Sequence, residues 1–192
     1  MRIHERFINH FNTVREHRRL VREGCFAVGL YRQGLLHDLS KYSPVEFFVG
    51  AKYYQGYRSP NNAEREAKGY SSAWLHHKGR NLHHYEYWVD YAASEGIGVR
   101  PVKMPVKYMV EMFMDRVAAS KTYNGKEYTD DMPLAYFLKG KRIIVMHPET
   151  KRQLEFLLRM LAKSGEEKTF TYIREKVLKK KFLIGRLIHE KR

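Results

Sequence analysis

The sequence predicts a single all-α domain. Apolar residues recur at helical spacing along most of the chain, for example Phe7, Phe11, Val14 and Val21 near the N-terminus. Proline and glycine residues separate these stretches and mark the expected helix ends. The chain has 192 residues, 43% of them hydrophobic, which suffices for one hydrophobic core. We find no internal repeat and no low-complexity linker, so we expect one domain over residues 1–192.

Composition and charge limit the compartment and the partners. The formal net charge of +15 favours anionic partners such as phosphorylated small molecules, nucleotides or nucleic acid. Cys25 is the only cysteine, which excludes an intrachain disulfide and suits a reducing cytoplasm. The charged N-terminus predicts no signal peptide, and no apolar run approaches the roughly 18 residues of a membrane span. We therefore expect a cytoplasmic protein with no membrane contact.

Two helices are expected at the start of the chain. An amphipathic helix spans roughly residues 3–22, ends at Gly24, and carries His17 close to its apolar stripe. The segment 25–39 is apolar enough for a buried helix, although Gly34 weakens it. A glycine at this position would let another helix approach closely.

The next helix is predicted from its start signals. Ser43 is expected at the N-cap, Pro44 at the first helical position and Glu46 at the third. The polar segment 56–62 that follows contains Ser-Pro-Asn-Asn, which is typical of a turn.

A further helix is expected from about Ala63. Tyr70, Trp74 and His77 follow i, i+4, i+7 spacing, so His77 shares the apolar face and His76 is rotated away from it. His77 is therefore the better candidate ligand of these two histidines.

Two more helices are expected in the middle of the chain. One begins at about His83 and is ended by Gly96 and Gly98. The other follows Pro105, and Asp115 lies on the flank of its apolar stripe. That stripe comprises Val106, Met109, Val110, Phe113 and Val117.

The last third of the chain gives weaker signals. We expect a core of about residues 1–123 and a basic helical extension of about residues 124–192. The segment 143–146 suits a strand or a helix equally, and a longer helix is predicted from Pro148 to Gly165.

The adjacent pair His37-Asp38, followed by a lysine, gives the clearest chemical signal. A neutral imidazole beside a carboxylate forms part of a site for Mn, Fe, Zn, Co or Ni. Such an ion activates water and neutralises phosphate charge, and a lysine or arginine steadies the remaining phosphate oxygens. The expected ligands are His17, His37, Asp38 and Asp115, with Lys41 or Arg116 at the phosphate.

In their order, these residues resemble the signature of the HD phosphohydrolase superfamily. The run Leu36-His37-Asp38-Leu39-Ser40-Lys41 looks like its His-Asp-x-x-Lys form, with His17 on the helix before and Asp115 on a later helix. The resemblance implies an HD-like helical fold and one metal ion held by His17, the His-Asp pair and Asp115. It also implies a second ion, because extra histidines lie between the His-Asp pair and Asp115, namely His77, His83 and His84.

A second run adds to this resemblance. Asn81-Leu82-His83-His84-Tyr85-Glu86 is similar to the Asn-x-His-His-x-Glu pattern of an uncharacterised HD-like family of bacteria and phages, which also has His-Asp-x-Ser-Lys. The likeness covers roughly residues 14–119. No Gly-Tyr-Pro follows the paired histidines, so the substrate of the cyclic dinucleotide phosphodiesterase branch is not implied.

Three residues near these runs are weaker candidates. Adjacent histidines seldom face the same point, so His76 and His84 are less certain ligands than His77 and His83, and one histidine of each pair could stand behind the ligands. Glu86 could orient a ligand histidine or form an ion pair on the surface.

More than one function agrees with these patterns. The favoured prediction is a metal-dependent phosphohydrolase that uses an activated water on a phosphate mono- or diester, such as a nucleotide. A di-iron oxygenase of the same fold is the enzymatic alternative. A basic nucleic-acid-binding or partner-binding protein is the non-enzymatic one, for which Lys179–Lys181 would supply charge. A homo-oligomer is compatible with each.

Overall fold

The computed structural model describes residues 2–92 and 98–179. It confirms the all-α class, because these residues form eight α-helices and one small two-stranded sheet. The α-helices are α1 (Ile3–Ala27), α2 (Tyr31–Leu36), α3 (Pro44–Lys52), α4 (Pro60–Lys68), α5 (Ser72–Lys78), α6 (Val106–Asn124), α7 (Met132–Gly140) and α8 (Pro148–Tyr172).

Short elements connect these helices. Strands β1 (Val89–Tyr91) and β2 (Val99–Pro101) pair antiparallel, with Val89 opposite Pro101. The remaining elements are 3-10 helices η1 (Leu39–Tyr42), η2 (Tyr85–Trp88) and η3 (Gly125–Glu127), and a π-helix η4 (Ile173–Leu178).

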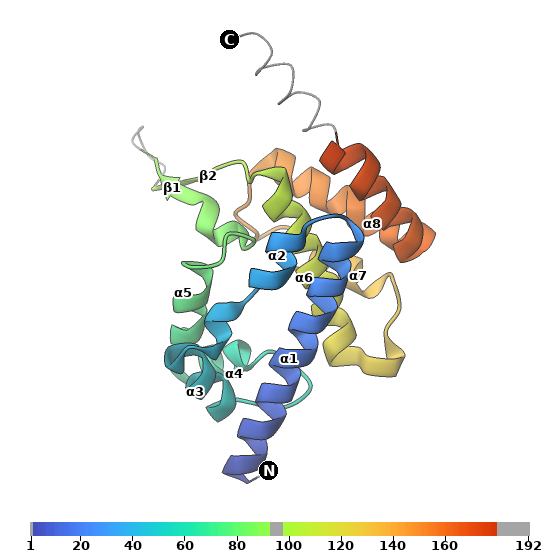
Figure 1. The fold of residues 1–192 in the computed structure, drawn as a ribbon. Helices are drawn as coiled ribbons and strands as arrows, with labels where there is room; N and C mark the ends of the chain where they lie inside the picture. Colours follow the sequence, from blue (N-terminus) through green and yellow to red (C-terminus); the bar gives the residue numbers. More distant parts are fainter. Residues whose placement is uncertain (1, 93–97, 180–192) are drawn as a thin grey trace.

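The helices are arranged around α1 and α6, which pack along each other. Figure 1 shows α3, α4 and α5 on one side of α1, and α7 and α8 on the other. α3 contacts both α1 and α5, so it joins the central helices to the outer group. The space between α1, α6 and α5 is where the candidate site lies.

The apolar core lies at the α8 side of the molecule. Val21 of α1, Phe113 of α6 and Phe137 of α7 are buried in one cluster with Leu154 and Leu158 of α8. Residues from the predicted extension therefore pack directly against the helices of the predicted core. The boundary at about residue 124 stays a prediction.

The first helix is longer than predicted. It continues through Gly24 to Ala27, so the expected end at Gly24 is wrong. A Cβ on Gly24 would lie 2.9 Å from Met114 Sδ. This glycine therefore lets α6 approach α1 closely instead of ending the helix.

The segment 25–39 does not form one helix, because Gly29 has φ +85° and turns the chain before α2. Gly34 fulfils the expectation of a close approach, since a Cβ there would lie 3.1 Å from Cys25 Cβ. α2 thus folds back onto the end of α1, which brings the His-Asp pair beside both central helices.

The segment from Ala63 to His77 is also divided. Helix α4 already begins at Pro60, and Gly69, with φ +80°, separates it from α5. Tyr70 lies in this connection and is 54% exposed, so its expected place on an apolar helical face is wrong. The position of His77 on the buried face of α5 is as predicted.

The α-helix expected to begin at His83 does not form in the described part of the chain. A turn, η2 and the paired strands β1 and β2 lie in the described parts of residues 83–101, and Gly96 lies outside the described ranges. Gly98 precedes β2 instead of ending a helix. Paired β-branched and aromatic residues such as Val89, Tyr91 and Val99 suit strands better than a helix.

The C-terminal third is close to its prediction, with two differences. Residues 143–146 form neither strand nor helix, and α8 continues beyond Gly165, where the φ of +78° breaks its helical geometry. Lys180 and the residues after it lie outside the described ranges, as does most of the basic tail.

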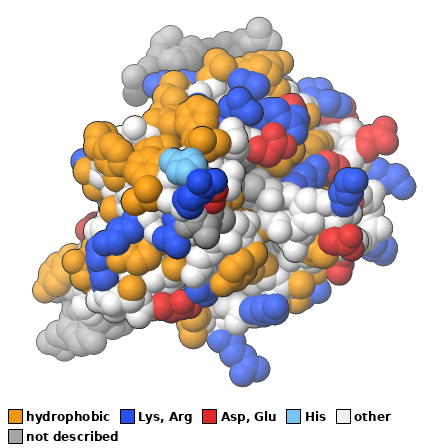
Figure 2. Space-filling model, turned by 90° about the horizontal axis from the view of Figure 1, so that it is seen from below, with side chains coloured by type: hydrophobic (Ala, Val, Ile, Leu, Met, Phe, Trp, Pro, Cys, Tyr) orange, Lys and Arg blue, Asp and Glu red, His pale blue; other side chains and the backbone are white. Residues whose placement is uncertain are grey.

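Charged and apolar side chains are both found on the surface. On the face shown in Figure 2, Lys and Arg side chains are spread widely and apolar side chains gather toward one side. Within the described ranges, the helices are all too short or too polar to span a bilayer.

Candidate metal centre

The centre is built on a turn at Asp38, between α2 and η1. Asp38 has φ 53° and ψ 27°, the only left-handed conformation of a non-glycine residue in the described ranges. Aspartate adopts this conformation more readily than most residues. The turn directs the adjacent side chains of His37 and Asp38 into the interior, where they are 2% and 1% exposed.

One group of candidate ligands, the first half-site, lies on the Oδ2 side of Asp38. His17 Nε2 on α1 is 3.0 Å from Asp115 Oδ1 on α6 and 3.7 Å from Asp38 Oδ2. His37 Nε2 is 3.4 Å from Asp38 Oδ2 and 3.6 Å from Asp115 Oδ1. The first half-site comprises His17, His37, Asp38 and Asp115, whose ligand atoms lie close enough to hold a metal ion.

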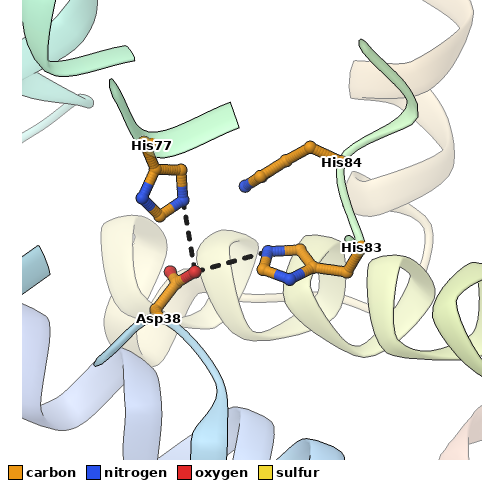
Figure 3. Close-up of side chains that lie close together, drawn as sticks. All are labelled: Asp38, His77, His83 and His84. Atoms are coloured by element: carbon orange, nitrogen blue, oxygen red, sulfur yellow. Dashed lines mark ion pairs between the residues drawn. The ribbon is translucent and has the colours of Figure 1, made fainter. Parts of the chain in front are cut away.

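A second group, the second half-site, lies on the Oδ1 side of Asp38. His77 Nε2 is 3.2 Å and His83 Nε2 is 3.3 Å from this oxygen. Figure 3 shows both rings directed at it, with the ring of His84 pointing into the same space. The second half-site comprises Asp38, His77, His83 and His84. Asp38 is the residue that the two half-sites share.

His83 and His84 converge, although the sequence predicts that adjacent histidines diverge. Their ring centroids are 4.1 Å apart, and that of His84 is 4.8 Å from that of His77. The backbone of His84 is extended (φ −86°, ψ 128°) in the turn before η2, and such a turn can bring neighbouring side chains together. His76 lies outside both half-sites.

Several buried atoms at the centre form no hydrogen bond of regular geometry among the described residues, although ion-pair contacts such as that of Lys41 Nζ to Asp38 Oδ2 at 2.7 Å lie around them. They are Nε2 of His17, His37, His83 and His84, and both carboxylate oxygens of Asp38. Unpaired buried polar atoms are costly, and imidazole nitrogens and carboxylate oxygens are ligands that transition metals accept. The residues present therefore fit bound divalent ions.

Glu46 supports the second half-site from behind. Its Oε2 accepts a hydrogen bond from His77 Nδ1 at 2.7 Å, and its Oε1 accepts one from His76 Nδ1 at 2.6 Å. α3 begins at Pro44 as predicted, but within the described chain the Ser43 side chain forms no capping hydrogen bond. The sequence pattern assigned Glu46 to the capping of the first turn of this helix, whereas in the tertiary structure its carboxylate faces the histidines.

Glu111 is a second supporting carboxylate that the sequence analysis did not identify. Its Oε1 is 3.0 Å from His37 Nδ1 and 3.3 Å from His83 Nδ1. Glu111 lies four residues before Asp115, and this spacing places both carboxylates on one face of α6. The four-residue spacing of Glu111 and Asp115 could have identified Glu111 from the sequence. The sequence analysis of this helix considered its apolar stripe instead.

Ser40 and Asn81 fasten the two sequence runs to each other. Asn81 Nδ2 donates hydrogen bonds of 2.8 Å to Ser40 Oγ and to the backbone oxygen of His77. Ser40 Oγ also lies 3.2 Å from His77 Nδ1. The serine of His-Asp-x-Ser-Lys and the asparagine of Asn-x-His-His-x-Glu thus hold α5 against the turn at Asp38.

The start of α5 is fixed by a buried carboxylate. Glu64 of α4 is fully buried and accepts hydrogen bonds from Ser71 Oγ at 2.7 Å and Ser72 Oγ at 2.6 Å. Ser71 Oγ in turn accepts the backbone N–H of Trp74 at 3.0 Å, which caps the helix. This network sets the position of a helix of only seven residues.

At His37 and Asp38, electrostatic attraction outweighs the cost of burial. Burial lowers the pKa of His37, but Asp38 and the neighbouring carboxylates raise it to about 10. Burial raises the pKa of Asp38, yet the charges of His37 and Lys41 bring it well below its usual range. Burial and the nearby histidines both lower the pKa of His84. Either protons on the histidines or bound metal ions can therefore compensate the negative charge of these carboxylates.

The remaining predicted site residues lie in different places. Lys41 Nζ is 2.7 Å from Asp38 Oδ2, and its side chain is 30% exposed, so it lies at the open edge of the centre. Arg116 lies over the ring of Phe137, and Glu86 lies beside Tyr85. In the described chain, neither forms a hydrogen bond or an ion pair with a residue of the half-sites.

The fold and the site define a class: an all-α protein with buried His, Asp and Glu groups that could hold metal ions. Residues 6–160 match the model of a family of unknown function, DUF5662, so the chain belongs to that family. The match includes every residue of both half-sites. No curated protein and no solved structure matches the chain. The helical fold and the buried cluster are compatible with the HD resemblance.

Proposed function

We propose that this protein is a metal-dependent phosphohydrolase of HD-like fold that acts on a phosphorylated small molecule. The observation that supports it is the shared carboxylate: Asp38 presents Oδ2 to the first half-site and Oδ1 to the second. Because imidazole groups lie on both sides of Asp38, this carboxylate and the histidines around it would hold two divalent ions.

The ligands suit Mn, Fe, Zn, Co or Ni, because a set that includes histidine nitrogens disfavours Mg, which prefers oxygen ligands only. A bound pair of such ions lowers the pKa of water and offsets phosphate charge. The chain contributes four carboxylates around the centre, which such ions would neutralise, namely those of Asp38, Glu46, Glu111 and Asp115.

Lys41 is the residue that we assign to the substrate. Its ammonium group lies beside Asp38 at the open edge, where Asp115 is also 18% exposed. A phosphate that enters from this edge would meet the Lys41 charge together with the first half-site.

The first experiment combines metal analysis with hydrolysis. Protein purified without chelator is analysed for metal and assayed on p-nitrophenyl phosphate and bis(p-nitrophenyl) phosphate, beside Asp38→Asn and the surface control Glu149→Gln. Asparagine tolerates the left-handed turn, so Asp38→Asn removes charge while it preserves the backbone. We expect about two equivalents of metal and hydrolysis in wild type and control, and neither in Asp38→Asn.

Other results would point to the alternatives. Iron alone, with oxygen uptake and no phosphate release, would replace the hydrolase by a di-iron oxygenase. Protein that stays metal-free after addition of Mn, Fe, Zn, Co or Ni would refute both enzymes and leave a buried network of histidines and carboxylates. Binding to nucleic acid would then be the next assay.

A further inference from the structure

His37 and His83 form a pair that links the half-sites. Their ring centroids are 4.3 Å apart. Each ring directs Nε2 at Asp38, at 3.4 Å from Oδ2 and 3.3 Å from Oδ1 respectively. Each ring also directs Nδ1 at the same atom, Glu111 Oε1, at 3.0 and 3.3 Å. The two imidazoles therefore lie between two carboxylates, one at the centre and one behind it.

A carboxylate behind a ligand histidine accepts its second N–H, which fixes the ring and makes the opposite nitrogen a better ligand. His37 belongs to the first half-site and His83 to the second, so a single oxygen of Glu111 serves both. Glu111 is only 6% exposed, and water therefore competes little for these bonds. We propose that Glu111 is a positioning residue shared by the two half-sites and that it couples their affinities for metal.

Glu46 provides the contrast that makes this inference specific. It is as deeply buried as Glu111, at 5% exposed, and it also accepts hydrogen bonds from two imidazoles. Of these, however, only His77 belongs to a half-site, since His76 lies outside both. Glu46 should therefore position the second half-site alone. The inference rests on the metal binding proposed above.

The test compares Glu111→Gln with Glu46→Gln, the same change at two buried glutamates. Metal-free protein is titrated with Co²⁺ and followed by calorimetry and by the visible absorption of the bound ion. We expect Glu111→Gln to weaken metal binding at both half-sites by about 10–100-fold. We expect Glu46→Gln to weaken binding by that amount at the second half-site alone. Glu111→Gln that weakens a single step, or neither, overturns the shared role.

A second measurement needs no metal. In metal-free protein, Glu111→Gln should shift the imidazole N–H proton signals of both His37 and His83, and Glu46→Gln should shift that of His77. If the wild type takes up no Co²⁺, the proposed function fails, and these signals still decide the role of Glu111. Unchanged signals at His37 or His83 overturn it. Thermal unfolding of each metal-free variant shows whether the fold is retained.

Discussion

In the first half-site, His17 and Asp115 are carried by α1 and α6, two long helices that pack along each other. In the second, the histidines stand on the seven-residue α5 and on the turn after it. Apolar packing by residues such as Val21 and Phe113 fixes the first group. Hydrogen bonds to buried polar side chains fix the second.

The difference has a physical reason. A short helix has few apolar contacts and cannot hold itself in place, because most helical stability in proteins comes from packing. Glu46, Glu64, Ser40 and Asn81 replace that packing with directional bonds. Such a network is strong when complete and weak when one member is lost. The two half-sites should therefore respond differently to the same kind of substitution.

The largest effect is expected at the ligands themselves. His17→Asn should weaken metal binding at the first half-site by more than about 100-fold and leave binding at the second half-site unchanged. His77→Asn should weaken binding at the second half-site by the same factor and leave the first unchanged. Titration of metal-free protein with Co²⁺ measures both steps. If either variant abolishes both steps, the division into two half-sites is wrong.

Acidification should weaken the packing of α3 against α1. Burial and the charge of Lys41 lower the pKa of His10 on α1 to about 4 from 6.5. The folded protein therefore binds fewer protons at this residue, and stability falls as the pH drops from about 6.5 to about 4. The full effect is about 3 kcal/mol.

His10→Leu isolates this contribution, because leucine stays neutral throughout. Urea unfolding of wild type and variant at several pH values between 7 and 4 gives the difference in slope. Equal slopes would show that His10 is not the titrating group.

A smaller effect is expected where α3 meets α1. A Cβ on Gly50 would lie too close to His10 Nε2, whose ring packs against Phe47 and Tyr54. Gly50→Ala should therefore cost about 1–3 kcal/mol in the free energy of unfolding. Gly79→Ala is the matched control, because its Cβ would find its nearest neighbour at 3.5 Å. Denaturant midpoints that move equally in the two variants would contradict this account.

The smallest effect is expected at the cap of α5. Ser71→Ala removes the bond to the Trp74 N–H and one bond to Glu64, at a cost of about 1 kcal/mol. Metal binding at the second half-site should then weaken about fivefold, while binding at the first half-site is unchanged. A Co²⁺ titration in which both steps weaken equally would show that the network supports the whole centre.

The long helices and the first half-site could be predicted because their signals are local. The apolar stripe of α6 places Asp115, and the order of His17, the His-Asp pair and Asp115 identifies a ligand group. Metal binding by these residues stays a prediction, although the structure brings them together. The predicted helix end at Gly24 was wrong because this glycine makes room for a side chain of a helix distant in sequence, which the local pattern does not show.

By itself, then, the sequence determined the helical class, the helices with long apolar stripes, and which residue types converge at the His-Asp turn. Only the tertiary structure decided that Asp38 is shared, that His84 joins His83, and that Glu46 and Glu111 stand behind the ligands. Glu111 and His37 are 74 positions apart, and Glu46 and His77 are 31 apart. Contacts between such distant residues depend on how helices and turns pack, which local periodicity does not encode.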